Sequence, residues 1–188
     1  MKNRTCPDET DLLSPRKKQR SLDTARGLLV ERWKAATALE KESDRAVALI
    51  TAAFIDEALA ALLRHALVDD AKILDELLGT DRPLGTFSSR IKLAYCLGHI
   101  SHGSFRDLET IRAIRNDFAH SREALNFHSP GIKDRCLKLR APLIIPGDAF
   151  PDLKNPRVRY VESTSWLVNV LQAREREVQR PTWPSDRP

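Results

Sequence analysis

The sequence predicts an all-α protein, a helical bundle of about five to seven helices with a long proline-rich loop before the C-terminal helix. Apolar residues recur every three or four positions along most of the chain, which is the helical period. Glycine, proline and capping residues separate these periodic stretches. Helical patterns outnumber plausible strands, and no internal repeat of 20 to 50 residues is visible. The 188 residues therefore suit one helical domain with tails.

Composition sets the expected domain limits. Residues 1–25 contain the basic run Pro15–Arg20 and few large apolar residues, so we expect a flexible basic arm. Residues 26–180 are expected to form a single helical domain, and residues 181–188, where prolines recur, a disordered tail.

The first helices are predicted from apolar spacing. A helix is expected over about 25–41, followed by a core helix that begins near Asp44, where negative charge suits the helix dipole. A shorter helix over Asp70–Leu78 should end at Gly79. The predicted buried face of the core helix comprises Val47, Ile50, Phe54, Ala58 and Leu62.

Two further helices are expected between residues 87 and 120. The first should end near Gly103, and Ser104 followed by Asp107 resembles a capping box that predicts a second helix from Phe105. Arg115 falls on the same arc as the apolar positions of that second helix. The predicted apolar positions are Phe87, Ile91, Ala94 and Tyr95 in the first helix, and Leu108, Ile111, Ile114 and Phe118 in the second.

The C-terminal third is dominated by proline. Five prolines between Ser129 and Pro156 predict a long loop rather than a regular helix. Val158 and Tyr160 could form a brief extended piece, after which Thr164 is expected to cap the last helix.

Charge and cysteine content limit the function classes. The net charge of +5 would permit contact with nucleic acid, although acidic and basic residues are interspersed. The three cysteines, Cys6, Cys96 and Cys136, form no close pair, which argues against a disulfide framework and for a reducing compartment. The first residues lack the apolar stretch of a signal peptide, and no stretch reads as a membrane span, so we expect a cytoplasmic protein.

The tract from Pro83 to Ile100 carries a family resemblance. It contains a proline-leucine-glycine turn, a serine-x-arginine opening and a lysine-leucine-x-tyrosine-x-leucine-glycine helix, and it resembles the mannitol-operon repressor family. The resemblance extends from the helix bearing Glu57 to about Phe127. It implies an all-helical bacterial dimer that regulates transcription through protein partners rather than through a recognisable DNA-reading motif. The matching residues are Pro83, Leu84, Gly85, Ser88, Arg90, Lys92, Leu93, Tyr95, Leu97, Gly98 and Ile100.

Several charged residues are candidate binding residues. Arg90 and Lys92 lie near the first turn of a helix, where the dipole disfavours cations, so we expect partners for them. Asp56 or Glu57 could pair with Arg90, and a ligand or partner site is the alternative. Arg112 lies on the second helix of an apparent helix-turn-helix, although an αα-hairpin has the same sequence pattern. The candidate binding residues are Arg90, Lys92, Glu57 and Arg112.

Arg115, Asn116 and His120 resemble the motif of HEPN-type ribonucleases. The resemblance implies a toxin or defence enzyme that cuts RNA without metal, with guanidinium holding a phosphate and imidazole exchanging a proton. Positions five apart on a helix diverge by about 140°, so convergence requires a helix end near His120 or a second protomer. A structural network, or binding without cleavage, is the alternative. These three residues are catalytic candidates only under the ribonuclease hypothesis.

Cys96, His99 and His102 have a spacing typical of zinc ligands, but a fourth ligand is missing nearby. We therefore expect no metal and no cofactor. The expected partners are a second copy of the chain and a protein involved in transcription control, with contact to RNA or DNA through basic residues as a further alternative.

Overall fold

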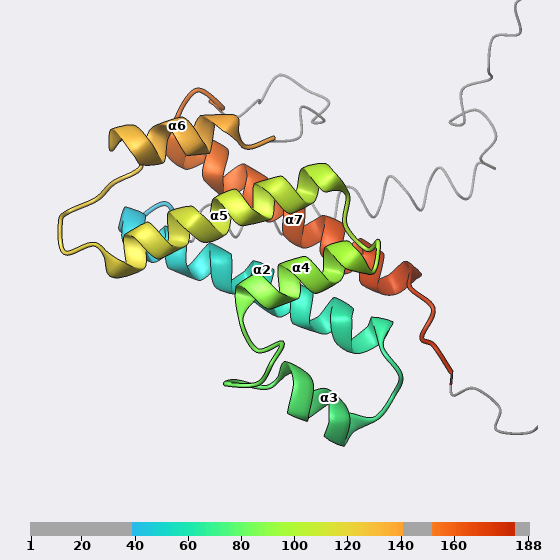
Figure 1. Ribbon diagram of the computed structural model, residues 1–188. Helices are drawn as coiled ribbons and strands as arrows, with labels where there is room; N and C mark the ends of the chain where they lie inside the picture. Colours follow the sequence, from blue (N-terminus) through green and yellow to red (C-terminus); the bar gives the residue numbers. More distant parts are fainter. Residues whose placement is uncertain (1–38, 141–151, 183–188) are drawn as a thin grey trace, which may run out of the picture. The chain divides into compact units, whose positions relative to one another are not determined.

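The computed structural model describes residues 39–140 and 152–182, which contain six α-helices and no strand (Figure 1). This confirms the predicted all-α fold and helix number. The chain divides into two compact units, residues 1–41 and 42–188, and the six helices belong to the second. The predicted basic arm, almost all of the helix predicted over 25–41, and most of the predicted tail lie outside the described residues.

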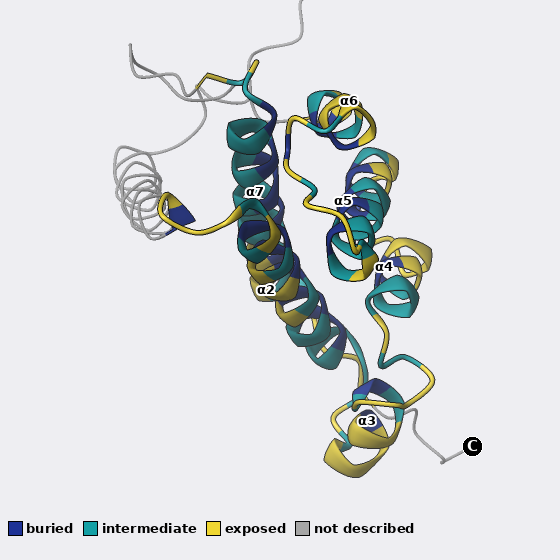
Figure 2. Ribbon diagram, turned by 90° about the vertical axis from the view of Figure 1, so that its left-hand side faces the viewer, coloured by how far each residue is buried: buried dark blue, intermediate teal, exposed yellow. Residues whose placement is uncertain are grey.

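Helix α2, Asp44–Ala66, is the centre of the bundle. It packs along α7, Pro156–Glu177, and its neighbouring side contacts α5, His102–His120, and α4, Phe87–Cys96. Figure 2 shows the buried residues of α2, α5 and α7 turned toward one another. The remaining described helices are α3, Ala71–Leu78, and α6, Pro130–Lys138.

The buried face of α2 agrees with the predicted one only in part: Val47, Ala58 and Leu62 are buried as expected. Ile50 and Phe54 are 37% and 50% exposed, whereas Thr51, Ile55 and Leu59 are buried. The helix is apolar on nearly every side, so spacing alone could not show which stripe faces the core. By length and composition α2 could also cross a membrane, although half of its most apolar window is buried inside the bundle.

The start of α5 also differs from prediction. Ser101 is the N-cap, and its hydroxyl oxygen accepts a hydrogen bond from the Ser104 amide at 3.1 Å. The predicted capping box at Ser104 and Asp107 is therefore wrong, because both residues already lie inside the helix and are buried. Ser101 itself satisfies the first-turn amide, so the helix begins three residues earlier than expected.

The loop predicted over 129–156 is shorter than expected. Pro130 lies in the first turn of α6, and Pro156 in the first turn of α7, where the missing amide hydrogen costs no helical bond. Asn155 caps α7, so the predicted extended piece at Val158 and Tyr160 and the predicted cap at Thr164 are wrong. Residues 141–151, between the two helices, lie outside the described residues.

Three aromatic rings join α5, α7 and the segment before α6. Phe127 lies between Phe118 and Tyr160, with ring centroids 5.1 and 5.0 Å away, and all three side chains are fully buried. The Tyr160 hydroxyl donates to the Ala48 carbonyl at 3.2 Å, and burial raises the pKa of this phenol. This cluster fixes the N-terminal half of α7 against α2.

Candidate functional site

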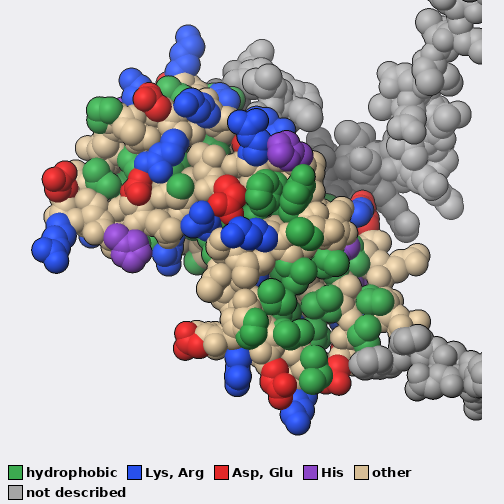
Figure 3. Space-filling view, in the orientation of Figure 1, with side chains coloured by type: hydrophobic (Ala, Val, Ile, Leu, Met, Phe, Trp, Pro, Cys, Tyr) green, Lys and Arg blue, Asp and Glu red, His purple; other side chains and the backbone are tan. Residues whose placement is uncertain are grey.

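An exposed group of apolar and aromatic side chains lies where α4 ends and α5 begins. We call Tyr95, Leu97, His102 and Phe105 the aromatic patch. The Tyr95 and Phe105 rings stack with centroids 4.6 Å apart, and the Tyr95 hydroxyl lies 3.3 Å from Nδ1 of His102. Tyr95 and Leu97 remain 38% and 42% exposed, so Tyr95, although it has the helical spacing predicted for α4, lies outside the core. Figure 3 shows hydrophobic side chains gathered over α4 on this face.

The local sequence explains why the patch forms. The Leu97 amide donates to the Leu93 carbonyl, and Gly98 then adopts a φ of 72°, which glycine tolerates without a steric penalty. The chain reverses there, and Ser101 caps the new helix three residues later. The last turn of α4 is consequently placed beside the first turn of α5.

Two exposed basic side chains lie close to the patch residues in sequence, and a third packs on another face of α5. Lys92 precedes Tyr95 by one turn of α4 and is exposed, and Arg106 follows Phe105 on α5 and is exposed. Arg140 reaches α5 from the end of α6, with its Nε 3.1 Å from Oδ2 of Asp107. Its guanidinium covers Gly103 and leaves no room for a Cβ at that position. Gly103 and Phe105 are about 160° apart around α5, so Arg140 lies on a different face of that helix from Phe105.

The Arg90 guanidinium makes its contacts inside the folded chain. Its Nη1 lies 2.8 Å from Oδ1 of Asp56, which confirms the predicted ion pair with α2. The same guanidinium donates to the carbonyls of Leu78 and Leu84 at 2.8 and 3.2 Å, and its side chain is 12% exposed. Arg90 therefore ties α2 and α4 to the turn between α3 and α4.

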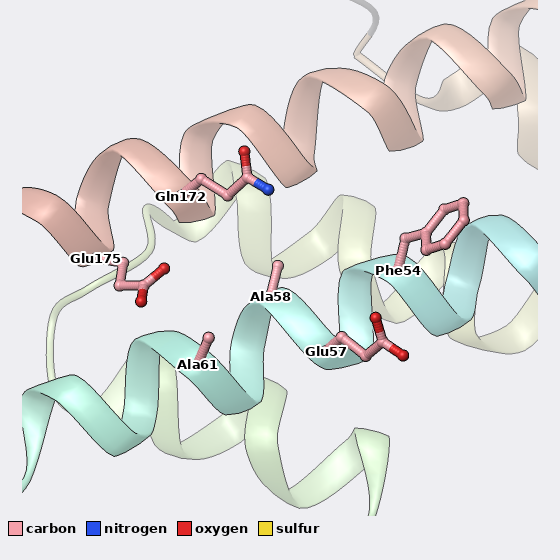
Figure 4. Close-up of a pocket in the computed structure, with 6 residues that line it drawn as sticks. All are labelled: Phe54, Glu57, Ala58, Ala61, Gln172 and Glu175. Atoms are coloured by element: carbon pink, nitrogen blue, oxygen red, sulfur yellow. The ribbon is translucent and has the colours of Figure 1, made fainter. Parts of the chain in front are cut away.

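The other candidate binding residues are not gathered in one site. Glu57 lines a shallow groove of about 250 Å³ between α2 and α7, together with Phe54, Gln172 and Glu175 (Figure 4). Arg112 pairs with Glu109 on its own helix at 2.7 Å. Of the four predicted binding residues, Lys92 is the one beside the aromatic patch.

Arg115 and Asn116 are hydrogen-bonded to one another, Nη1 to Oδ1, at 3.1 Å. Both are half-buried on α5, which continues without a break to His120. His120 is exposed, and because the helix stays regular its side chain diverges from that of Arg115. Within one chain the three ribonuclease candidates therefore do not converge.

The three residues with a zinc-like spacing, Cys96, His99 and His102, lie in separate environments. Cys96 is exposed, His102 faces Tyr95, and burial together with the nearby Arg174 lowers the pKa of His99. No group of three potential metal ligands is assembled within residues 39–140 and 152–182. Cys136 is buried in α6, where burial raises the pKa of its thiol to about 12.

Sequence reasoning missed the exposure of Leu97 and the place of Arg140. Two signals could have shown the first: glycine at position 98 ends α4, and a leucine beside a helix end is not held in an apolar stripe. Nothing in the spacing could have placed Arg140 beside Gly103, because 37 positions separate them.

Comparison with known proteins identifies the family. No curated protein matches the chain. The chain is similar to the X-ray structure of the MtlR–HPr complex from Escherichia coli, with 22% sequence identity, a TM-score of 0.59, and coverage of 78% of this chain and 99% of that one. The family model described as mannitol repressor, MtlR, matches residues 37–177. Because this match spans most of the length of this chain, the chain belongs to the mannitol repressor family.

Proposed function

We propose that this chain is a transcription regulator that acts by binding a partner protein through the aromatic patch. The observation that carries the proposal is the exposure of Tyr95 and Leu97 beside the stacked Phe105. Aromatic side chains that remain exposed in a monomer are typical of protein interfaces, where they supply much of the binding energy.

The proposed partner is a protein of the HPr kind. The support is the similar fold of MtlR, which was solved as a complex with HPr. A homodimer is part of the proposal as well, since α2 leaves Ile50 and Phe54 exposed on one side. Direct reading of DNA is not part of the proposal.

Replacing Tyr95 by Ala should weaken the binding of HPr from the organism that encodes this chain by about 30-fold or more, because a hot-spot aromatic contributes about 2 kcal/mol or more. Isothermal titration calorimetry measures the dissociation constant. Ile73→Ala is the matched control, since Ile73 is 47% exposed on α3, away from the patch. Unchanged affinity in the Tyr95 variant, or no binding by the wild type, would contradict the proposal.

A second candidate function is metal-independent RNA cleavage by Arg115 and His120. One observation favours it: the half-buried Arg115 guanidinium has a hydrogen bond to Asn116 and, among the described residues, no carboxylate partner. An anionic phosphate could bind the Arg115 guanidinium as its charged partner. Since His120 diverges from Arg115 along α5, the active form would need His120 from a second subunit.

Under this second function, His120→Ala should reduce cleavage of a fluorescently labelled RNA by about 100-fold or more, the usual contribution of general acid–base catalysis. His128→Ala is the control, because His128 is an exposed histidine outside the helix. Equal cleavage by wild type and His120→Ala would show that any nuclease activity in the preparation has another source.

A further inference from the structure

The groove between α2 and α7 has an aromatic, acidic end. Phe54 is 50% exposed there, and Glu57 and Glu175 line the same groove from the two helices (Figure 4). Neither carboxylate takes part in an ion pair within the described residues. Between Arg45 and Arg64 the sequence of α2 contains no lysine or arginine that could neutralise Glu57. A cation from outside can therefore bind between an aromatic ring and a free carboxylate.

An exposed cation without a carboxylate partner lies beside the groove on α7. Arg176 follows Gln172 by four positions, so the two side chains lie within about 40° of each other around the helix. Gln172 lines the groove, and no carboxylate contacts Arg176 among the residues that the structure describes. The other cations near this end of the two helices are already paired: Arg64 with Asp75, Arg174 with Glu177, and Arg180 with Asp69.

The anionic and cationic ends of this face are separated along the helices. The N-terminal turns of α2 and α7 are joined by an ion pair and a hydrogen bond, and their C-terminal halves line one groove, so the two helices run in the same direction. This alignment places Arg176 roughly 10 Å beyond Glu57, toward the C-terminal ends. Ala58 and Ala61 lie between them, and their small side chains let another helix approach closely.

We propose that this face of α2 and α7 binds the same face of a second copy of the chain, with a two-fold axis near Ala61. The partner subunit's Arg176 would lie over the Phe54 ring and against the Glu57 carboxylate, and the symmetric contact would form in return. Ile50, one turn before Phe54 and 37% exposed, extends the apolar part of the interface. This inference rests on the homodimer in the proposed function and adds the residues through which the two copies bind.

Self-complementarity favours a second copy as the occupant. A two-fold interface requires one surface to carry both halves of each contact, and this face carries a free carboxylate at one end and a free guanidinium at the other. A guanidinium gains from both neighbours, since it forms charge-assisted hydrogen bonds with carboxylates and stacks on aromatic rings. The groove volume of about 250 Å³ is below the usual range of about 300–1,000 Å³ for small-molecule pockets, so a side chain suits it better than a free ligand.

The test is sedimentation velocity of the full-length chain, which measures the dissociation constant of the dimer. Glu57→Arg and Arg176→Glu should each raise this constant at least about tenfold, because each variant brings like charges together at two symmetric contacts. Glu76→Arg on α3 is the matched control and should leave the constant unchanged, since Glu76 is exposed outside this face. A wild type that is monomeric at about 100 μM, or a dimer that neither reversal weakens, would overturn the inference.

A mixture of the two reversed variants locates the contact. In a mixed dimer the arginine introduced at position 57 faces the glutamate introduced at position 176, while the native Arg176 of one chain faces the native Glu57 of the other. The two variants should therefore bind each other at least about tenfold more tightly than either binds itself. Thermal melts verify that both variants fold. If the folded variants do not associate in the mixture, Glu57 and Arg176 do not meet and the inference is wrong.

The two proposals fail separately. Tyr95-dependent binding of HPr by a chain that sediments as a monomer would reject this interface and keep the regulator that binds HPr. A dimer that dissociates on charge reversal at Glu57 and Arg176, in a chain that does not bind HPr, would keep the interface and reject the proposed partner.

Discussion

Replacing Phe127 by Ala should lower the free energy of unfolding by about 3–5 kcal/mol, the usual cost of truncating a buried aromatic side chain. Phe127 is fully buried between Phe118 and Tyr160. Its removal would leave a cavity between α5, α7 and the segment before α6. The rings of Phe118 and Tyr160 cannot fill this cavity unless their own helices move. Urea denaturation followed by circular dichroism measures the change.

The matched control is Ile73→Ala, which removes an apolar side chain that is 47% exposed. We expect a change within about 1 kcal/mol there. A Phe127 variant as stable as the wild type would mean that the segment before α6 does not pack between α5 and α7 as described.

Replacing Arg90 by Met should lower the free energy of unfolding by about 2–4 kcal/mol. The change keeps most of the side-chain volume but removes every donor to Asp56, Leu78 and Leu84. Two carbonyl oxygens and a carboxylate would then lose a charged partner in a place where the side chain is 12% exposed. The same denaturation experiment measures the effect.

Lys92→Met provides the comparison two residues along the same helix. Lys92 is exposed, so its replacement should change stability by about 0.5 kcal/mol or less. If Arg90→Met is as stable as the wild type but fails to bind the partner, then Arg90 is a binding residue rather than a structural one.

The helices that the sequence predicts well are those whose ends carry local signals. Asp70 and Gly79 bracket α3 as expected, and the predicted pairing of Arg90 followed from the cost of a cation in the first turn of a helix. The starts of α6 and α7 were predicted as loop because each contains a proline. A proline in the first turn of a helix cannot be told from a proline in a loop by sequence alone.

The candidate site was harder to predict than the fold. Tyr95 has the spacing of a core residue, and its exposure depends on where α5 crosses α4, which no local pattern encodes. On α2 the same difficulty appears at Phe54, because an apolar helix offers several stripes and tertiary packing selects one. The place of Arg140 beside Gly103 is likewise set by tertiary packing, because it depends on how the end of α6 lies beside α5.

The most direct measurement is a titration of the ¹⁵N-labelled chain with HPr, in which each backbone amide reports its own change in chemical shift. We expect the largest changes at the end of α4 and the start of α5, around Tyr95, Leu97 and Phe105. Changes concentrated instead at the groove of Glu57 and Glu175, or no change at all, would contradict the claim that this protein regulates through the aromatic patch.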